Sequence, residues 1–181
     1  LLGQSLNNKT LGIVGMGRIG RATAKKAAFG LGMKVAYYNR SPISDLGPFE
    51  AQKFDSIREL CACSDFVSLH CASSEDTKHI LDSEAIAALS TDAIVINTAR
   101  GDVLDEEALI TALEDGSIGG AGLDVYQNEP NINARLLEAP NTVFLPHLGS
   151  ATIETRNAMG FRVVQNLESF FTGKKVPDVV V

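Results

Sequence analysis

The sequence predicts an α/β fold, an open and doubly wound parallel β-sheet with helices on both faces. Two observations lead to this prediction. Short β-rich runs alternate with helical segments along the 181 residues, and such alternation is typical of parallel strands joined by helical crossovers. Most of these runs are apolar on both faces, which fits strands that helices cover on each side. The length suits one domain over residues 1–181.

The pattern of apolar residues predicts six strands and six helices. The expected strands are Thr10–Gly15, Lys34–Tyr38, Phe66–His70, Ala93–Thr98, Ala121–Val125 and Thr142–Pro146. The expected helices are Arg18–Leu31, Ser56–Ala62, Asp82–Leu89, Asp105–Glu114, Asn133–Glu138 and Ile153–Phe171. The helix from Asp105 has three acids in its first turn and Gly116 just past its end. The stretch from Arg40 to Phe49 contains two prolines and a glycine and is expected to be an irregular loop.

The last expected helix carries an apolar stripe. Thr152 precedes this helix as a candidate N-cap, and Gly173 follows it as a candidate end. The stripe has helical spacing and consists of Phe161, Val164, Leu167 and Phe171. Such a stripe is most simply a packing face. We therefore expect residues 153–181 to lie at an interface with a second domain.

Charge and composition restrict the classes of partner. The net charge of −6 argues against nucleic acid, and no run approaches the roughly 20 apolar residues of a membrane helix. The first 44 residues carry seven basic side chains and no acid, which suits an anionic ligand held by this part of the chain. The three cysteines form no disulfide-like framework and fit a reducing compartment. We expect Cys61 and Cys63 to be small buried residues and predict no metal site.

The sequence GMGRIG follows the first expected strand and opens the first expected helix. Gly15 allows a tight turn, Gly17 lets a pyrophosphate approach the backbone, and Gly20 lets the helix pack close to the strand. The N–H groups and the dipole of the helix then face the phosphates. This context predicts a Rossmann-like dinucleotide site rather than a purely structural turn. The cofactor residues expected here are Gly15, Gly17, Arg18, Ile19 and Gly20.

The end of the second strand distinguishes between cofactors. An acid there would accept hydrogen bonds from the adenosine ribose, but Asn39 stands near its place, followed by Arg40 and Ser41. Without the carboxylate there is no repulsion toward a 2′-phosphate, and the guanidinium and the hydroxyl match phosphate oxygens. We predict NADP(H) over NAD(H), with NAD still possible. The alternative is that Arg40 is only a solvated loop residue.

Three later residues carry reactive groups near strand ends, where open α/β sheets bind ligands. Arg100 follows a buried strand and suits the carboxylate and carbonyl of a 2-oxo acid; a surface ion pair is its alternative role. Glu129 and His147 could form a proton relay in which the carboxylate fixes the imidazole. His147 could otherwise be an ordinary loop residue. His70 could line the adenosine side, and His79 is expected to be exposed.

With these residues assembled, the chain resembles the nucleotide-binding domain of the D-isomer-specific 2-hydroxyacid dehydrogenases. The resemblance runs from Thr10 to Thr152 and rests on LGIVGMGRIG, INTARGDVLDEEAL, GAGLDVYQNEP and PHLGSAT. Asn39, Arg40 and Ser41 look like the NADP-preferring glyoxylate/hydroxypyruvate reductase branch. One departure is Ala72, where a proline is usual, which affects the adenine-side loop.

The resemblance implies roles for the matching residues. Arg100 would orient and polarise the substrate, His147 would donate the proton, and Glu129 would be the partner of His147. The cofactor contacts would include His70, Thr98, Ala99, Asp124 and Gly149.

The resemblance also implies an enzyme larger than this chain. An N-terminal substrate domain, absent here, would complete a cleft for a small 2-oxo or D-2-hydroxy acid, so that this chain alone would bind NADP(H) with little turnover. A homodimer and a cytoplasmic location are expected, although a targeting segment stays open. The main alternative is a non-catalytic, corepressor-like module that senses NAD(P)(H). A formate- or phosphite-oxidising relative is a third.

Overall fold

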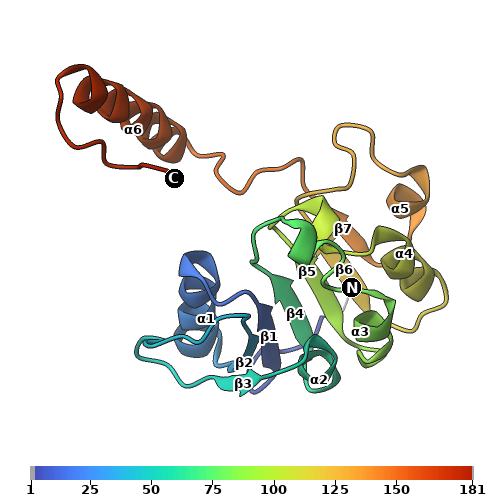
Figure 1. Cartoon of the computed structure of the whole chain (residues 1–181). Helices are drawn as coiled ribbons and strands as arrows, with labels where there is room; N and C mark the ends of the chain where they lie inside the picture. Colours follow the sequence, from blue (N-terminus) through green and yellow to red (C-terminus); the bar gives the residue numbers. More distant parts are fainter. Residues whose placement is uncertain (1–2, 181) are drawn as a thin grey trace. The chain divides into compact units, whose positions relative to one another are not determined.

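The computed structural model describes residues 3–180, which divide into two compact units, one up to His147 and one from Leu148 onward. The first unit contains a seven-stranded sheet in the order β3-β2-β1-β4-β5-β6-β7 (Figure 1). Every neighbouring pair of strands is parallel. The predicted α/β fold with a parallel sheet is therefore confirmed. The second unit is described separately below.

The structure has all six predicted strands and one more. The strands are β1 Thr10–Val14, β2 Lys34–Tyr38, β3 Gln52–Phe54, β4 Phe66–Leu69, β5 Ile94–Asn97, β6 Gly120–Leu123 and β7 Thr142–Phe144. The additional strand is β3, which the sequence pattern did not predict and which pairs with β2 from Ala36 and Gln52 onward. This strand is short, lies at the edge of the sheet, and leaves Gln52 and Lys53 exposed. Such a strand has no apolar pattern to reveal it.

The helices of the first unit also lie where the pattern of the sequence places them. They are α1 Arg18–Leu31, α2 Ile57–Ala62, α3 Ser83–Ala87, α4 Glu106–Glu114 and α5 Ala134–Glu138, with 3₁₀ turns η1 Glu75–Thr77 and η2 Gly101–Val103. Four of the predicted first residues are N-caps: Ser56, Asp82, Asp105 and Asn133. Each of these side chains accepts a hydrogen bond from a backbone N–H two or three residues further on, which satisfies a donor of the first turn.

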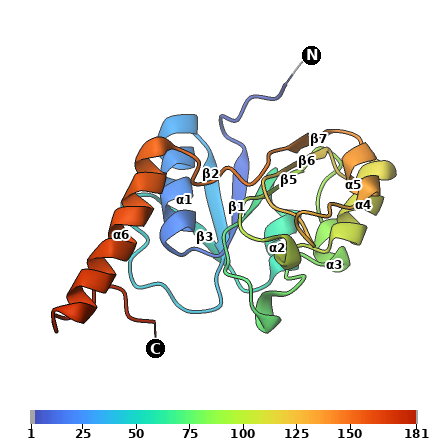
Figure 2. The same cartoon turned by 90° about the horizontal axis from the view of Figure 1, so that it is seen from above.

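Helices lie on both faces of the sheet (Figures 1 and 2). On one face α2 packs against β1, β2, β3 and α3, while α3 contacts α4 and α4 contacts α5. The larger apolar core lies under these helices and includes Val67 and Val95. A second core, which includes Ile13 and Ala24, lies under α1. Because β1 sits between β2 and β4, the chain builds outward in both directions from this point, which is where open α/β sheets form their ligand crevice.

The second unit consists of α6, Ile153–Phe171, and the tail that follows it. The Thr152 side chain caps the helix by accepting a hydrogen bond from the N–H of Thr155. The tail folds back, and Arg162 Nε donates to Asp178 Oδ2 at 2.6 Å. No residue of α6 is buried, and Phe161 and Phe171 are 74% and 79% exposed. The predicted bounds of the helix are confirmed, and its place at an interdomain face stays a prediction.

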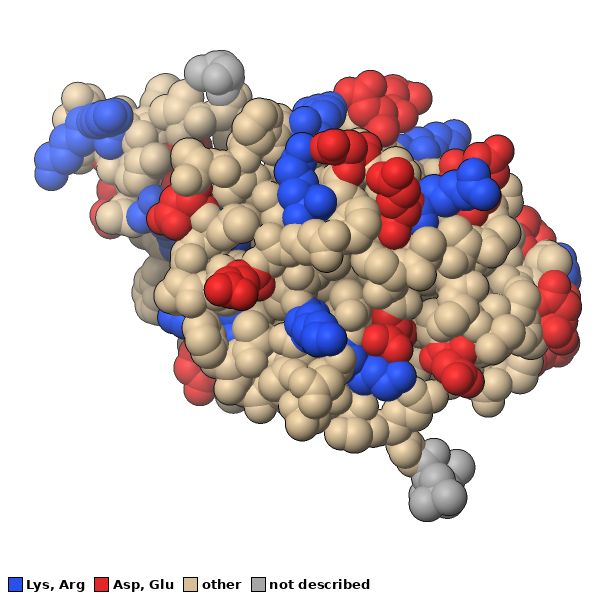
Figure 3. Space-filling model, turned by 90° about the horizontal axis from the view of Figure 1, so that it is seen from below, with Lys and Arg blue, Asp and Glu red and all other residues tan. Residues whose placement is uncertain are grey.

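The cysteines and the charges differ in part from expectation. Cys61 is buried, and burial raises the pKa of its thiol to about 12, but Cys63 is exposed, contrary to the prediction. Cys63 is the C-cap residue that follows α2, whose buried residues are Leu60 and Cys61. On the face drawn in Figure 3, acidic and basic side chains are intermixed. Among the described helices, none is both long and apolar enough to cross a membrane, and residues 3–180 contain no group of three potential metal ligands.

Candidate cofactor and catalytic site

The glycine turn after β1 brings three chain segments close together. Gly15 has a φ of +96°, and a Cβ there would lie 2.6 Å from the backbone N of Cys71, two residues after β4. A Cβ on Gly20 would overlap the carbonyl oxygen of Gly15. Any side chain at these two positions would therefore push α1 or the end of β4 away from β1. Gly17 differs, because a Cβ there would meet nothing within 4 Å.

The first turn of α1 faces this open space. Gly17 occupies the N-cap position, no side chain caps the helix, and no acid stands in its first turn. Arg18 and Ile19, the first helical residues, are exposed. Backbone N–H groups at such a terminus are free to bind an anion, and the helix dipole favours negative charge there. The residues present thus fit the pyrophosphate of a dinucleotide.

A cavity of about 380 Å³ lies beside the glycine turn, at the carboxyl ends of β1, β2 and β4. Six of the predicted cofactor residues line it: Gly15, Gly17, Asn39, Arg40, Ser41 and His70. Cys71, Ala72, Asp76 and Thr77 close it from the segment after β4. His70 is half-buried and hydrogen-bonded to the Ser68 hydroxyl at 2.9 Å, and burial lowers its pKa. The structure therefore brings the predicted adenosine side together from three separate parts of the chain.

Both ends of the Asn39 side-chain amide are hydrogen-bonded to the backbone around this cavity. Its Oδ1 accepts a hydrogen bond from the N–H of Met16 at 3.0 Å, and its Nδ2 donates to the carbonyl of Ser41 at 2.8 Å. One amide thus ties the glycine turn to the loop after β2. Asn39 shapes the site, which the sequence analysis did not anticipate when it placed this residue only by its distance from the glycines.

Arg40 is not free in the described structure. Its Nη1 lies 2.7 Å from Oδ2 of Asp76 in η1, and the two side chains are 73% and 74% exposed. The chain therefore supplies a carboxylate to Arg40 from η1, although no acid stands beside Arg40 at the end of β2. The acid comes from a segment 36 residues further along the chain, so no pattern around the end of β2 could reveal it.

The turn after β5 presents Arg100. Asn97 is fully buried, and its side chain accepts from the N–H of Ala99 at 3.0 Å and donates to the carbonyl of Arg100 at 2.8 Å. A Cβ on Gly101 would overlap the backbone carbonyl of Tyr126, so glycine alone lets this turn pack against the segment after β6. Arg100 itself is exposed, and its Nη1 donates to the carbonyl of Ala99 at 2.6 Å.

Glu129 and His147 form the expected pair. Nδ1 of His147 lies 2.9 Å from Oε2 of Glu129, and their side chains are 50% and 34% exposed. His147 has a φ of +55°, a left-handed conformation that non-glycine residues adopt at some cost in energy. If Nδ1–H donates to the carboxylate, Nε2 is the ring atom left to exchange a proton with a ligand.

The surroundings of Glu129 keep it ionised. The hydrogen bond from His147 holds the pKa of this carboxyl below its usual range, and the N–H of Tyr126, which donates to Oε1 at 2.8 Å, acts in the same direction. Arg100 adds a smaller Coulombic contribution. An ionised carboxylate in this place orients the imidazole ring through its contact with Nδ1.

Tyr126 links the three candidate catalytic residues, a role that the sequence pattern did not predict. Its backbone N–H holds Glu129, its backbone carbonyl lies against Gly101 beside Arg100, and its hydroxyl donates to the carbonyl of Leu145 at 2.7 Å, two residues before His147. The residue as a whole is 7% exposed. A buried tyrosine in a strand-end motif can be found from sequence, but its three partners cannot, because they come from separate loops.

His79 was expected to be exposed, and this prediction is wrong. The residue is half-buried, and its Nε2 lies 3.1 Å from Nε2 of Gln127, which also donates to the carbonyl of Leu104 at 2.8 Å. His79 therefore supports the same segment, after β6, that carries Tyr126.

The remaining predicted cofactor residues do not line the cavity beside the glycine turn. Thr98 and Ala99 follow β5, and Asp124 follows β6, where it is 4% exposed and its N–H donates to the carbonyl of Asn97 at 2.9 Å. These three residues are at the same edge of the sheet as Arg100. Gly149 belongs to the second unit, so its role stays a prediction.

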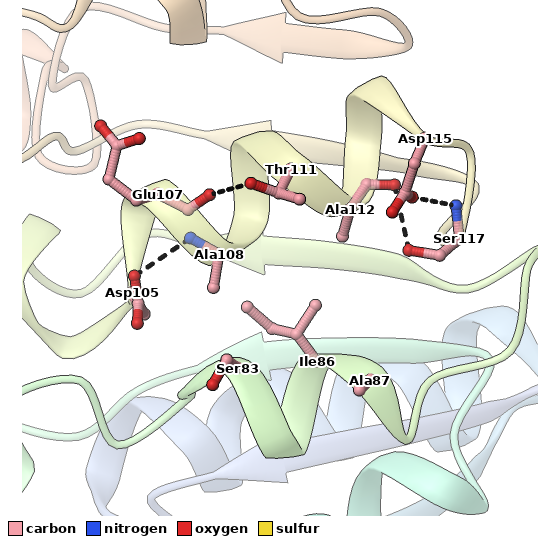
Figure 4. A pocket seen from close by; sticks show the side chains of 10 residues that line it. All are labelled: Ser83, Ile86, Ala87, Asp105, Glu107, Ala108, Thr111, Ala112, Asp115 and Ser117. Atoms are coloured by element: carbon pink, nitrogen blue, oxygen red, sulfur yellow. Dashed lines mark hydrogen bonds between the residues drawn. The ribbon is translucent and has the colours of Figure 1, made fainter.

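A further cavity, of about 420 Å³, lies between α3 and α4 (Figure 4). Its polar groups are bound within the chain: Asp105 caps α4, Glu107 pairs with Arg135 at 2.8 Å, and Asp115 accepts from the N–H of Ser117 at 2.9 Å. None of its lining residues lines the cavity beside the glycine turn.

The fold and the residues at the strand ends together define a Rossmann-like domain of the dinucleotide-binding class. Its features are a parallel sheet, a glycine turn, a helix N-terminus without a side-chain cap, and a Glu–His pair that follows the last two strands. Residues 1–149 match the D-isomer specific 2-hydroxyacid dehydrogenase, NAD binding domain. The chain belongs to this family.

Several individual proteins that are similar to this chain are reductases of 2-oxo acids. A glyoxylate reductase from Thermococcus litoralis is 44% identical over 179 residues, which are 99% of this chain and 54% of that protein. A glyoxylate/hydroxypyruvate reductase from Arabidopsis thaliana is 42% identical over 97% of this chain and 55% of its own length. The crystal structure of an NADPH-dependent glyoxylate/hydroxypyruvate reductase from Sinorhizobium meliloti, in complex with NADP and malonate, has a TM-score of 0.93 at 35% identity, covering all of this chain and 56% of that one. The chain thus spans about half the length of the relatives that it matches.

Proposed function

We propose that this chain is the cofactor-binding half of an NADP(H)-preferring oxidoreductase. The enzyme would interconvert a small 2-oxo acid of the glyoxylate or hydroxypyruvate type and its D-2-hydroxy acid. The observation that carries the proposal is the 2.9 Å contact between His147 and Glu129. The chain also belongs to a family of dehydrogenases, and Arg100 follows another strand of the same sheet.

The bound nicotinamide cofactor would supply or accept the hydride. The chain's own residues would bind and protonate the substrate. The guanidinium of Arg100 would bind the carboxylate and stabilise charge on the carbonyl oxygen. His147, protonated and oriented by Glu129, would donate a proton from Nε2 to that oxygen, and in the reverse direction the same nitrogen would accept it.

The cofactor preference is supported by the residues after β2. Arg40 and Ser41 line the adenosine cavity, and a guanidinium and a hydroxyl suit a 2′-phosphate. A structurally similar relative is described as NADPH-dependent. We infer a preference for NADPH, with NADH as a weaker cofactor.

We propose that the complete protein has a substrate domain outside residues 1–181, because relatives are nearly twice as long as this chain. We propose that the exposed apolar stripe of α6 packs at the face between the two domains. We further propose that the complete protein forms a homodimer and is located in the cytoplasm. Light scattering of the complete protein would test the dimer.

The experiment is a substrate screen with the complete protein and either NADPH or NADH. We expect reduction of glyoxylate or hydroxypyruvate with higher kcat/KM for NADPH. Equal or better efficiency with NADH would refute the cofactor preference. The isolated chain should bind NADPH with little turnover, and appreciable reduction of glyoxylate by it would refute the need for a second domain.

The variant His147→Ala should lower turnover by about 10²–10⁴-fold if this residue is the general acid. Its affinity for NADPH should stay close to that of the wild type, which separates lost chemistry from lost binding. An unchanged turnover would mean that another group donates the proton. Cofactor binding without turnover of any 2-oxo acid would favour a non-catalytic sensing module.

A further inference from the structure

We propose that Asp76 is a cofactor-selecting residue that lowers the preference for a 2′-phosphorylated dinucleotide. This inference rests on the proposed cofactor site. It concerns a residue of the turn after β4 and not the loop after β2, where the predicted determinants of cofactor choice lie.

The contact between Asp76 and Arg40 crosses the adenosine cavity. Arg40 follows β2, Asp76 lies in η1 after β4, and both residues line the same space of about 380 Å³. Their Nη1 and Oδ2 atoms are 2.7 Å apart. A ligand that uses the guanidinium of Arg40 must therefore compete with this carboxylate.

The pair is able to open, because it is exposed. Both side chains are about three-quarters exposed, and such surface ion pairs contribute little free energy. The backbone of Asp76 is nevertheless held in place. The N–H of Ser74 donates to Thr77 Oγ1 at 2.8 Å, and Thr77 Oγ1 donates to the carbonyl of Ala72 at 2.7 Å. The carboxylate can leave Arg40 but stays at the wall of the cavity.

Asp76 is also the one carboxylate among the described residues that line this cavity. Asn39 stands where an acid would bind the ribose, but both ends of its amide are engaged by Met16 and Ser41. A carboxylate accepts hydrogen bonds from ribose hydroxyls and repels a phosphate. Asp76 therefore favours the unphosphorylated dinucleotide, while Arg40 favours the phosphorylated one.

The consequence is that the two residues oppose each other in cofactor choice. Binding of a 2′-phosphate must break the pair and bring two negative groups near one another. Removing the charge of Asp76 should therefore tighten binding of the phosphorylated ligand by about three- to tenfold at low salt, a range set by solvent screening. Binding of the unphosphorylated ligand should stay equal or become weaker.

The test is calorimetric titration of the chain with two probes that differ only in the 2′-phosphate, 2′,5′-ADP and 5′-AMP. The variants are Asp76→Asn and, as a matched control, Glu75→Gln, which removes the neighbouring charge of the same turn but does not line the cavity. For Asp76→Asn we expect a three- to tenfold rise in the ratio of the affinity for 2′,5′-ADP to the affinity for 5′-AMP. For Glu75→Gln we expect less than a twofold change in this ratio. Circular dichroism would verify that both variants are folded.

Two results would overturn the inference while leaving the proposed function intact. One is an unchanged affinity ratio in Asp76→Asn when the wild type binds 2′,5′-ADP. The other is an equal rise in both variants, which would indicate a general effect of net charge. If wild-type chain binds neither probe and neither NADPH nor NADH, the proposed cofactor site fails, and this inference fails with it.

Discussion

The hydroxyl of Tyr126 offers a direct test of how the candidate catalytic residues are held together. The variant Tyr126→Phe keeps the ring, its burial and its contact with Phe144, whose ring centroid lies 6.1 Å away. It removes an O–H group that lies 2.7 Å from the carbonyl of Leu145 and 3.1 Å from that of Leu123. One hydroxyl proton serves one acceptor at a time, so one hydrogen bond is lost.

The magnitude follows from what happens to the two carbonyls. The carbonyl of Leu123 keeps the N–H of Leu145 as a partner at 2.9 Å. The carbonyl of Leu145 loses its donor, but Leu145 is 47% exposed, and water is within reach. The loss is then that of an ordinary hydrogen bond, about 1 kcal/mol, and not the larger cost of a buried unsatisfied group.

Urea denaturation of the chain measures this difference. We expect a lower midpoint with an unchanged m-value, because the same surface is exposed on unfolding. Tyr37→Phe is a matched control: its ring is also buried, and its hydroxyl makes no hydrogen bond with the described residues. In the complete protein, Tyr126→Phe should lower kcat more than it changes KM for the cofactor. Equal stability of Tyr126→Phe and the wild type would refute the reasoning, and so would equal losses in both variants.

Two further predictions concern the same loops. Gly101→Ala should destabilise the chain by about 1–3 kcal/mol, because its Cβ would overlap the backbone of Tyr126, which cannot move aside as a side chain can. Gly122→Ala is the control, since a Cβ there meets nothing within 4 Å, and equal losses in denaturation would refute the steric argument. Glu129→Gln should change the acid dependence of stability. The folded-state pKa of Glu129 is lowered, so this residue stabilises the fold above the ordinary glutamate pKa of about 4.3 and loses that effect as the pH falls through the lower folded value. Stability measured from pH 6 to pH 2 should therefore fall less steeply in Glu129→Gln, and parallel curves for the two proteins would contradict the assignment.

Much of the fold was predictable because its signals are local. Apolar runs marked six of the seven strands, and Ser56, Asp82, Asp105 and Asn133 marked helix starts through their capping chemistry. The glycine turn was predictable for the same reason, since its spacing follows from a tight turn between a strand and a helix. The strand β3 was not, because three edge residues with no buried face carry no periodic signal.

The residues of the candidate site and the pairing of Glu129 with His147 were predictable from the sequence, but the other contacts of these residues were not. Residues that follow parallel strands gather at one edge of a sheet, so Arg100, Glu129 and His147 could be grouped from sequence alone. The partners of these residues depend on loops that lie far apart in the chain. Tyr126 and Asp76 became visible only when those loops were placed in space.

The sequence by itself determined the class of fold, the glycine turn and the identity of the reactive groups, since each depends on residues close together in the chain. The tertiary structure decided which groups are already paired. Arg40 has a carboxylate partner from a turn 36 residues away, and the Glu129–His147 pair is held by one buried tyrosine. Such pairings depend on the packing of whole elements against each other, which brings together side chains that no local pattern connects.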